Sequence, residues 1–279
     1  MLFSNDESLQ HKKVAQEIER LLPSRIPLIP SKEELELLLS LLDLTTLEGT
    51  DNAESVDLLC RKALGVAEKG FKGPAAICIY TPFIKQVRAA LSGTGITTAC
   101  VAGYFPSGQA PIQLKLEEIK FACEEGAEEI DIVIPRGKML AGEDSAVFDE
   151  ISAMREAAKN VHLKVILETG ELKMPSRVQK ASEIAIAAGA DFIKTSTGKV
   201  QPAATEDAAV TMLHVIRTHF NKTGNMIGFK PAGGISDPVQ AYRYLTLVKN
   251  IAGISWLSPD LFRIGASRLA DNLLKELLS

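Results

Sequence analysis

Short apolar runs rich in β-branched residues alternate along this chain with longer amphipathic segments. This alternation is typical of βα units, in which successive strands form a parallel sheet covered by helices. Strands are predicted at Leu41–Leu47, Ala75–Tyr80, Thr97–Tyr104, Glu129–Pro135, His162–Thr169, Asp191–Thr197, Met226–Lys230 and Leu261–Gly265. Helices are predicted between strands, for example at Ile112–Glu125, Ser145–Lys159, Ser176–Ala188, Glu206–Phe220 and Pro238–Lys249. Eight such repeats favour a closed (β/α)8 TIM barrel, an α/β fold, over an open doubly wound sheet.

A helical extension is predicted ahead of the barrel. We assign residues 1–38 to this extension and residues 39–279 to a single barrel domain. Glu7–Leu22 has the pattern of an amphipathic helix, and Ser31 with Glu34 that of a capping box that opens a second helix. Between them, residues 23–30 read as an extended, proline-punctuated connector. A structural role is favoured over a regulatory or partner-binding one, because the extension contains no polar constellation.

Composition and charge restrict the function classes. The chain has 279 residues, of which 46% are hydrophobic, so it can bury a large core as one domain. A formal net charge of -4 gives no general attraction for nucleic acid or anionic membrane. No apolar run approaches the ~20 residues of a membrane span, and the first residues lack the pattern of an export signal. We therefore expect a cytoplasmic enzyme that acts on small molecules.

Neither a metal site nor a nucleotide site is expected. The cysteines include no C-x-x-C pair, and the histidines include no pair spaced to hold a metal from one helix. No G-x-G-x-x-G or P-loop motif follows an early strand. We therefore predict no metal and no organic cofactor, and a reducing compartment.

Two lysines stand in similar surroundings near the end of successive strands. Lys194 lies in F-I-K-T-S-T-G-K and Lys230 in I-G-F-K-P-A-G-G. Burial lowers the pKa of a lysine and frees its lone pair, and a neighbouring cation lowers that pKa further. Either lysine alone is equally well explained by an ammonium that reaches solvent. The pair indicates a covalent nucleophile of the aldolase type.

Other polar residues lie near the strand ends, where barrel enzymes place their chemistry. We expect the following side chains to converge on one mouth: Asp43 and Thr45 from the first strand, Asp131 from the fourth, Lys194 and Thr197 from the sixth, and Lys230 from the seventh. Asp131 has apolar neighbours, and a lone buried carboxylate is costly, so Lys194 or Lys230 is its expected partner. Asp131 is then either a structural ion pair or a proton shuttle.

The last loops carry small residues that suit a phosphate group. Backbone N–H groups and a helix N-terminus after the final barrel strands often bind phosphate. Candidate residues are Gly198, Lys199, Gly233, Gly234, Gly265 and Ser267. Each glycine alone is also explained by a tight turn. Arg268 follows Ser267, and we favour an outward orientation for its side chain over a contact with phosphate.

Cys78 is predicted beside the mouth, at the end of the second strand. Buried cysteine usually packs as an inert apolar group. Next to a lysine pair its thiolate could instead be favoured, which would make it sensitive to aldehydes. We include Cys78 among the residues expected to contact substrate.

Several motifs together resemble the deoxyribose-phosphate aldolase family. They are D-L-T-T-L at 43–47, A-I-C-I-Y at 76–80, D-I-V-I-P at 131–135, L-E-T-G-E-L at 167–172, D-F-I-K-T-S-T-G-K at 191–199, G-F-K-P-A-G-G at 228–234 and F-R-I-G-A-S at 262–267. The resemblance covers roughly residues 40 to 270 in order. It implies a class I aldolase that reversibly cleaves 2-deoxy-D-ribose 5-phosphate to D-glyceraldehyde 3-phosphate and acetaldehyde, without a cofactor.

The resemblance also implies roles for individual residues. Lys194 would form the Schiff base, Lys230 would lower the pKa of Lys194, and Asp131 would act in proton transfer. Asp43 and Lys199 would position substrate hydroxyls, and the glycine loops with Ser267 would hold the phosphate. Its partners would be phosphosugar and aldehyde substrates. Independently of the resemblance, we expect a homo-oligomer, with a dimer as the first hypothesis. The alternatives are another class I sugar-phosphate aldolase or transaldolase, and a non-catalytic sugar-phosphate-binding barrel.

Overall fold

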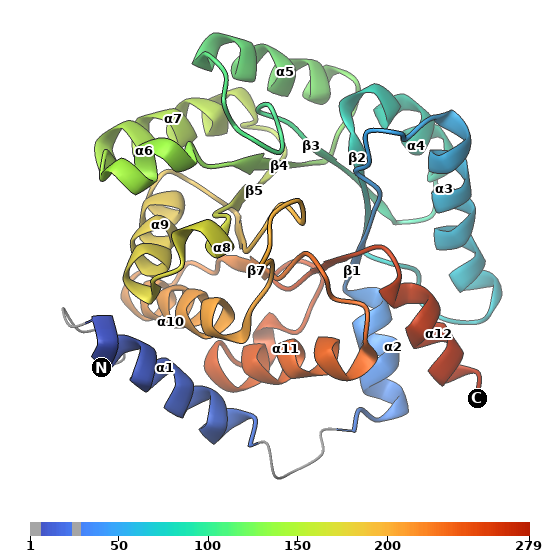
Figure 1. Cartoon of the computed structure of the whole chain (residues 1–279). Helices are drawn as coiled ribbons and strands as arrows, with labels where there is room; N and C mark the ends of the chain where they lie inside the picture. The colour runs from blue at the N-terminus through green and yellow to red at the C-terminus, as the bar shows by residue number, and fades with distance from the viewer. Residues whose placement is uncertain (1–6, 24–28) are drawn as a thin grey trace.

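A single ring of parallel strands forms the centre of the molecule (Figure 1). The computed structural model describes residues 7–23 and 29–279. The strands are β1 (Leu42–Thr45), β2 (Ala76–Tyr80), β3 (Thr97–Val101), β4 (Glu129–Val133), β5 (His162–Ile166), β6 (Phe192–Lys194), β7 (Gly228–Lys230) and β8 (Ile264–Ala266). The sheet order is β7-β6-β5-β4-β3-β2-β1-β8, and parallel bridges from Phe229 to Phe262 and from Ala232 to Gly265 join its two ends.

Helices surround this ring and follow its strands in turn (Figure 1). They are α3 (Ala53–Glu68), α4 (Ile84–Ala90), α5 (Ile112–Glu124), α6 (Arg136–Ala141), α7 (Asp144–Ala157), α8 (Thr169–Leu172), α9 (Pro175–Ala187), α10 (Glu206–Thr223), α11 (Pro238–Ile251) and α12 (Leu269–Leu277), with short 3-10 turns at Thr81–Phe83 and Ile254–Trp256. The prediction of a (β/α)8 TIM barrel is confirmed. Most strands are shorter than predicted, because the residues after them leave the sheet and form loops at the mouth.

The main apolar core lies between the strands and the helices. Side chains that point out of the ring, such as Ile77, Ile132 and Val165, are fully buried there. The interior of the ring is different. Barrels of this type are usually filled by branched apolar residues, whereas here Asp131 and Lys164 are completely buried, as are other charged side chains. Buried charges are costly unless they are paired, so the barrel interior contains an ion network.

The extension forms two helices, α1 (Glu7–Leu21) and α2 (Lys32–Ser40). The predicted capping box is present: Glu34 N–H donates to Ser31 Oγ at 3.3 Å, and Ser31 N–H donates to Glu34 Oε2 at 2.9 Å. In Figure 1, α1 lies outside the ring of helices, along α10. Most of the predicted connector, residues 24–28, lies outside the described residues.

The boundary drawn after residue 38 falls inside α2, which leads directly into β1. Leu38 and Leu39 of this helix are fully buried in the main core. The division into an extension and a barrel domain therefore stays a prediction. Over residues 7–23 and 29–279, no helix is both long enough and apolar enough to cross a membrane.

Candidate active site

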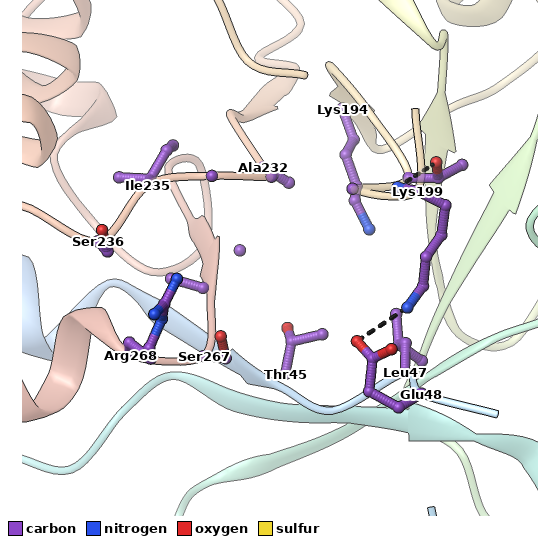
Figure 2. A pocket seen from close by; sticks show the side chains of 16 residues that line it. Thr45, Leu47, Glu48, Lys194, Lys199, Ala232, Ile235, Ser236, Ser267 and Arg268 are labelled. Atoms are coloured by element: carbon purple, nitrogen blue, oxygen red, sulfur yellow. Dashed lines mark hydrogen bonds and ion pairs between the residues drawn. The ribbon is translucent and has the colours of Figure 1, made fainter. Parts of the chain in front are cut away.

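A cavity of about 170 Å³ opens at the C-terminal ends of the strands. Most residues singled out from the sequence line it: Thr45, Lys194, Thr197, Gly198, Lys199, Gly233, Gly234, Gly265, Ser267 and Arg268. Figure 2 shows Lys194 and Lys199 on one side of this space, with Ser267 and Arg268 on the other. The loops after β1, β6, β7 and β8 therefore meet at one mouth, as the sequence predicts.

Lys194 and Lys230 meet at one carboxylate oxygen. They pair in register on β6 and β7. Lys194 Nζ donates to Asp131 Oδ2 at 2.7 Å, and Lys230 Nζ donates to the same oxygen at 2.8 Å. Lys194 borders the cavity, whereas Lys230 and Asp131 lie beneath it and are fully buried. The predicted partnership of Asp131 with the lysines is therefore present with both.

The surroundings shift the pKa values of the two lysines in opposite directions. Burial lowers the pKa of Lys194, and the charge of Lys230 lowers it further, against the opposing effect of Asp131. Burial also disfavours the charge on Lys230, but Asp131 and Asp43 outweigh it and raise the pKa of Lys230. Lys194 is thus the amine that loses its proton more easily, and Lys230 remains a cation beside it.

A second layer of ions below these residues was not predicted from the sequence. Lys164 lies 3.3 Å from Asp131 Oδ1 and hydrogen-bonds Glu129. Arg263 donates to both oxygens of the same carboxylate, at 2.8 Å to Oε1 and 3.2 Å to Oε2. A sequence signal for this layer exists, because Glu129 and Asp131 are two residues apart on β4 and must point to the same face of the sheet.

This layer continues to Asp43. Arg263 Nη1 donates to Asp43 Oδ1 at 2.6 Å, and Asp43 also pairs with Lys230. The network holds three carboxylates, on Asp43, Glu129 and Asp131, and three cations besides Lys194, on Lys164, Lys230 and Arg263. The charges of these six groups balance when Lys194 is neutral. A proton on Lys194 gives this buried network a net positive charge, although Asp131 lies beside it, and an excess buried charge is costly.

Two expected substrate contacts are not found at the cavity. Asp43 is completely buried below it, held by Lys230 and Arg263, so its carboxylate does not reach the lining residues. Cys78 lies in the middle of β2 rather than at its end, and packs in a small apolar cluster that includes Val101. Burial raises the pKa of Cys78 to about 11, so the residue stays a thiol. These observations favour an inert, packed thiol over the alternative of a reactive thiolate.

The glycines after β6 and β7 bring two backbones into contact. Gly233 has a φ of +92°, and a Cβ there would lie 2.6 Å from the Cβ of Ala203 and 3.0 Å from the Cα of Gly198. A side chain at Gly233 would therefore force these loops apart. The glycines thus do more than make turns, because they give the cavity a wall of backbone on this side.

Two charged residues at the mouth differ from expectation. Arg268 is the residue that precedes α12, and its side chain borders the cavity beside Ser267 instead of pointing away (Figure 2). Glu48, which the sequence did not suggest, accepts a hydrogen bond from Lys199 Nζ at 2.9 Å across the opening (Figure 2). This pair is exposed and contributes little to stability. The mouth therefore presents two cations, Arg268 and Lys199, and the exposed carboxylate of Glu48 pairs with Lys199.

Comparison with known proteins fits this geometry. The family model described as DeoC/LacD family aldolase matches residues 37–243. This chain belongs to the DeoC/LacD family of aldolases. Within the described ranges, no group of three or more His, Cys, Asp or Glu side chains is arranged to hold a metal ion.

Relatives of this DeoC/LacD aldolase come from distant organisms. The deoxyribose-phosphate aldolase of Homo sapiens is 46% identical over 249 residues, which cover 85% of this chain and 78% of the human protein. The deoxyribose-phosphate aldolase of Agrobacterium fabrum is 45% identical over 247 residues, which cover 88% of this chain and 92% of that protein. The solved structure of the deoxyribose phosphate aldolase from Aeropyrum pernix is described as a tetramer. It matches this structure with a TM-score of 0.67 and 25% sequence identity, over 95% of this chain and 97% of that one.

Proposed function

We propose that this aldolase reversibly cleaves 2-deoxy-D-ribose 5-phosphate to D-glyceraldehyde 3-phosphate and acetaldehyde, through a Schiff base on Lys194. The observation that carries the proposal is the pair of lysines on one oxygen of Asp131, with a lowered pKa for Lys194 and a raised one for Lys230. Imine formation needs a neutral amine, and an amine with a lowered pKa that lines a small cavity meets that need more easily. The names of the relatives support the choice of substrate.

The chemistry follows from these positions. The lone pair of Lys194 attacks the aldehyde carbon C1 of the open-chain sugar, and loss of water gives a protonated imine. The hydroxyl on C3 then loses its proton, the bond between C2 and C3 breaks, and its electrons flow into the imine to give an enamine. Glyceraldehyde 3-phosphate leaves. Protonation of the enamine at C2 and hydrolysis of the imine release acetaldehyde and restore Lys194.

Asp131 and Lys230 serve the proton transfers in this scheme. Burial would raise the pKa of Asp131, but Lys194, Lys230 and Lys164 hold it well below its usual range. Asp131 is therefore ionised and can accept the C3 hydroxyl proton, through a water molecule, once the amine of Lys194 is bound in the imine. Lys230, at 2.8 Å from Asp131, is the nearest proton donor for the return step.

The phosphate is proposed to bind between the loops after β6, β7 and β8. Gly233 and Gly234 supply backbone N–H groups, and Ser267 lies just before α12. Lys199 reaches the same space and would position a substrate hydroxyl or the phosphate. Asp43 is proposed to act only indirectly, by keeping Lys230 charged.

Replacing Arg268 with serine tests this phosphate site. Arg268 borders the cavity, and a charge-assisted contact from its guanidinium is worth ~1–3 kcal/mol. We expect KM for deoxyribose 5-phosphate to rise about tenfold, while unphosphorylated deoxyribose is cleaved as before. Steady-state kinetics with both substrates make the comparison. Equal changes for the two would show that Arg268 does not contact the phosphate.

A direct assay tests the proposed activity. We expect purified protein to release glyceraldehyde 3-phosphate and acetaldehyde in equal amounts from deoxyribose 5-phosphate, at a rate that overnight treatment with a chelator leaves unchanged. Fructose 1,6-bisphosphate and sedoheptulose 7-phosphate serve as comparison substrates for the other class I aldolases. Faster cleavage of either, or binding of deoxyribose 5-phosphate without products, would refute the proposal in favour of one of its alternatives.

Assembly and location are further parts of the proposal. We propose a homodimer, and light scattering on the purified protein would measure its mass directly. The relative from Aeropyrum pernix is described as a tetramer, so a mass of four chains is the main alternative. We also propose that the enzyme is cytoplasmic.

A further inference from the structure

Glu168 is a buried carboxylate that the proposed chemistry does not use. It follows β5, in the motif L-E-T-G-E-L, and has no exposed surface. Its backbone is left-handed, with a φ of +55° and a ψ of +60°. Both features cost free energy, because a side chain disfavours this backbone conformation and a buried carboxylate loses its hydration. Strained buried residues persist only where surrounding contacts hold them.

The contacts that hold Glu168 come from the loop that borders the cavity. Its carboxylate accepts two hydrogen bonds from Thr197, one from the backbone N–H at 3.2 Å and one from Oγ1 at 2.5 Å. Thr197 Oγ1 in turn accepts the backbone N–H of Lys199 at 3.1 Å. Thr197 and Lys199 both line the cavity. Glu168 thus binds one residue of the cavity lining, Thr197, and is linked through it to a second, Lys199.

The backbone of the turn that contains Glu168 also contacts other parts of the segment that follows β6. Thr169 N–H donates at 2.9 Å to the carbonyl of Thr195, which is the residue after Lys194. The next residue, Gly170, lies so close to the loop that a Cβ there would overlap the carbonyl oxygen of Pro202. Contacts therefore extend from the end of β6 to Pro202. In Figure 1, α8 lies inside the ring of outer helices, next to the barrel mouth.

Arg136 is the cation that faces Glu168. Its Nη1 lies 3.5 Å from Glu168 and 3.0 Å from the half-exposed carboxylate of Glu171. Burial raises the pKa of Glu168, while the bonds from Thr197 and the charge of Arg136 oppose that rise. Only the ionised carboxylate can accept from both donors of Thr197 without turning one of its oxygens into a donor.

We propose that Glu168 is a positioning residue, which holds the loop at 197–199 in the conformation that binds the phosphosugar and does not itself touch the substrate. This inference rests on the proposed function. It separates two properties of the site. Imine formation at Lys194 depends on the ion network beneath the cavity. Recognition of the larger substrate depends on the loop that Glu168 holds.

The test compares Glu168→Gln with Glu171→Gln. Both remove one carboxylate that faces Arg136, but only Glu168 binds the loop. A glutamine has one acceptor oxygen, so one donor of Thr197 loses its partner. We expect KM for deoxyribose 5-phosphate to rise at least tenfold in Glu168→Gln and to stay within twofold in Glu171→Gln. Trapping of acetaldehyde on Lys194 by borohydride should match wild type in both, because this two-carbon substrate does not need the loop.

A double-mutant cycle with Thr197→Val tests the link from its other end. Valine keeps the shape of the threonine but lacks the hydroxyl that joins Glu168 to Lys199. We expect KM for deoxyribose 5-phosphate in the double variant to be no higher than in the poorer single variant, because both substitutions break the same connection. If Glu168→Gln does not fold, Thr197→Val alone should show the raised KM with normal trapping.

Three outcomes would overturn the inference: an unchanged KM in Glu168→Gln or in Thr197→Val, fully additive losses in the cycle, or loss of acetaldehyde trapping in a folded Glu168→Gln. A different result bears on the proposed function. If wild-type protein neither cleaves deoxyribose 5-phosphate nor forms an adduct with acetaldehyde, the proposed function fails, whatever the variants do. The two failures are therefore distinguishable.

Discussion

Lys194→Leu should abolish cleavage of deoxyribose 5-phosphate, lowering kcat by at least about four orders of magnitude. Lys194 borders the cavity, and its amine is the one with a lowered pKa. Lys230 cannot replace it, because that amine lies beneath the cavity lining, bound to Asp131 and Asp43. The measurement is single-turnover product release, which detects slow residual chemistry better than steady-state rates.

The stability of this variant separates chemistry from folding. If Lys194 is neutral in the folded protein, leucine leaves the charge balance of the ion network unchanged, so the melting temperature should stay close to that of wild type. Lys85→Leu is a suitable control, because Lys85 is an exposed lysine paired only with Glu125 in the described part of the chain. It should keep full activity. Appreciable turnover in a folded Lys194→Leu would show that another amine forms the imine.

Lys230→Met should lower kcat/KM at pH 7 by roughly 10²–10³-fold and make the remaining activity rise steeply with pH. Removal of this cation leaves the network with one carboxylate in excess, so Asp131 draws a proton onto Lys194. The pKa of Lys194 then rises towards the ~10.4 of an unperturbed lysine. Below that pKa the neutral fraction of the amine grows about tenfold per pH unit. A pH–rate profile from pH 6 to pH 10 measures this effect.

Adding Asp43→Asn to this variant tests the role of charge balance. Asp43 does not line the cavity, and it pairs with Lys230 and Arg263. With both changes the network again has equal numbers of carboxylates and cations besides Lys194. The double variant should regain part of the ~3–5 kcal/mol lost when a buried pair is broken, and its pH profile should become flatter. A flat profile at full activity in Lys230→Met alone would mean that Lys230 is only structural.

The barrel and the reactive lysines can be predicted from the sequence because both depend on local patterns. Each strand lies in a short, mostly apolar run, and the order of strands and helices leaves few topologies. Lys194 and Lys230 occupy equivalent places on adjacent strands, and their register on β6 and β7 follows from this. Asp131 stands out as a charge in an apolar strand.

The rest of the site depends on contacts between distant strands, which no local pattern reveals. Arg263 meets Asp43 and Glu129 because β8 closes the ring beside β1, and the way in which the strands are staggered sets the depth of each side chain. Asp43 and Cys78 were expected near the substrate, but side chains near the start or middle of a short strand lie below the mouth. Arg268 faces the cavity because α12 begins at its edge.

Borohydride trapping tests most directly whether Lys194 is the amine that forms the Schiff base. The protein is incubated with acetaldehyde, reduced with sodium borohydride and mapped by peptide mass spectrometry. We predict an N-ethyl group on Lys194, in the peptide that contains F-I-K-T-S-T-G-K, and loss of activity in proportion to the fraction modified. The adduct should be absent from Lys194→Leu. An adduct on Lys230 alone, or full activity without any adduct, would contradict this account.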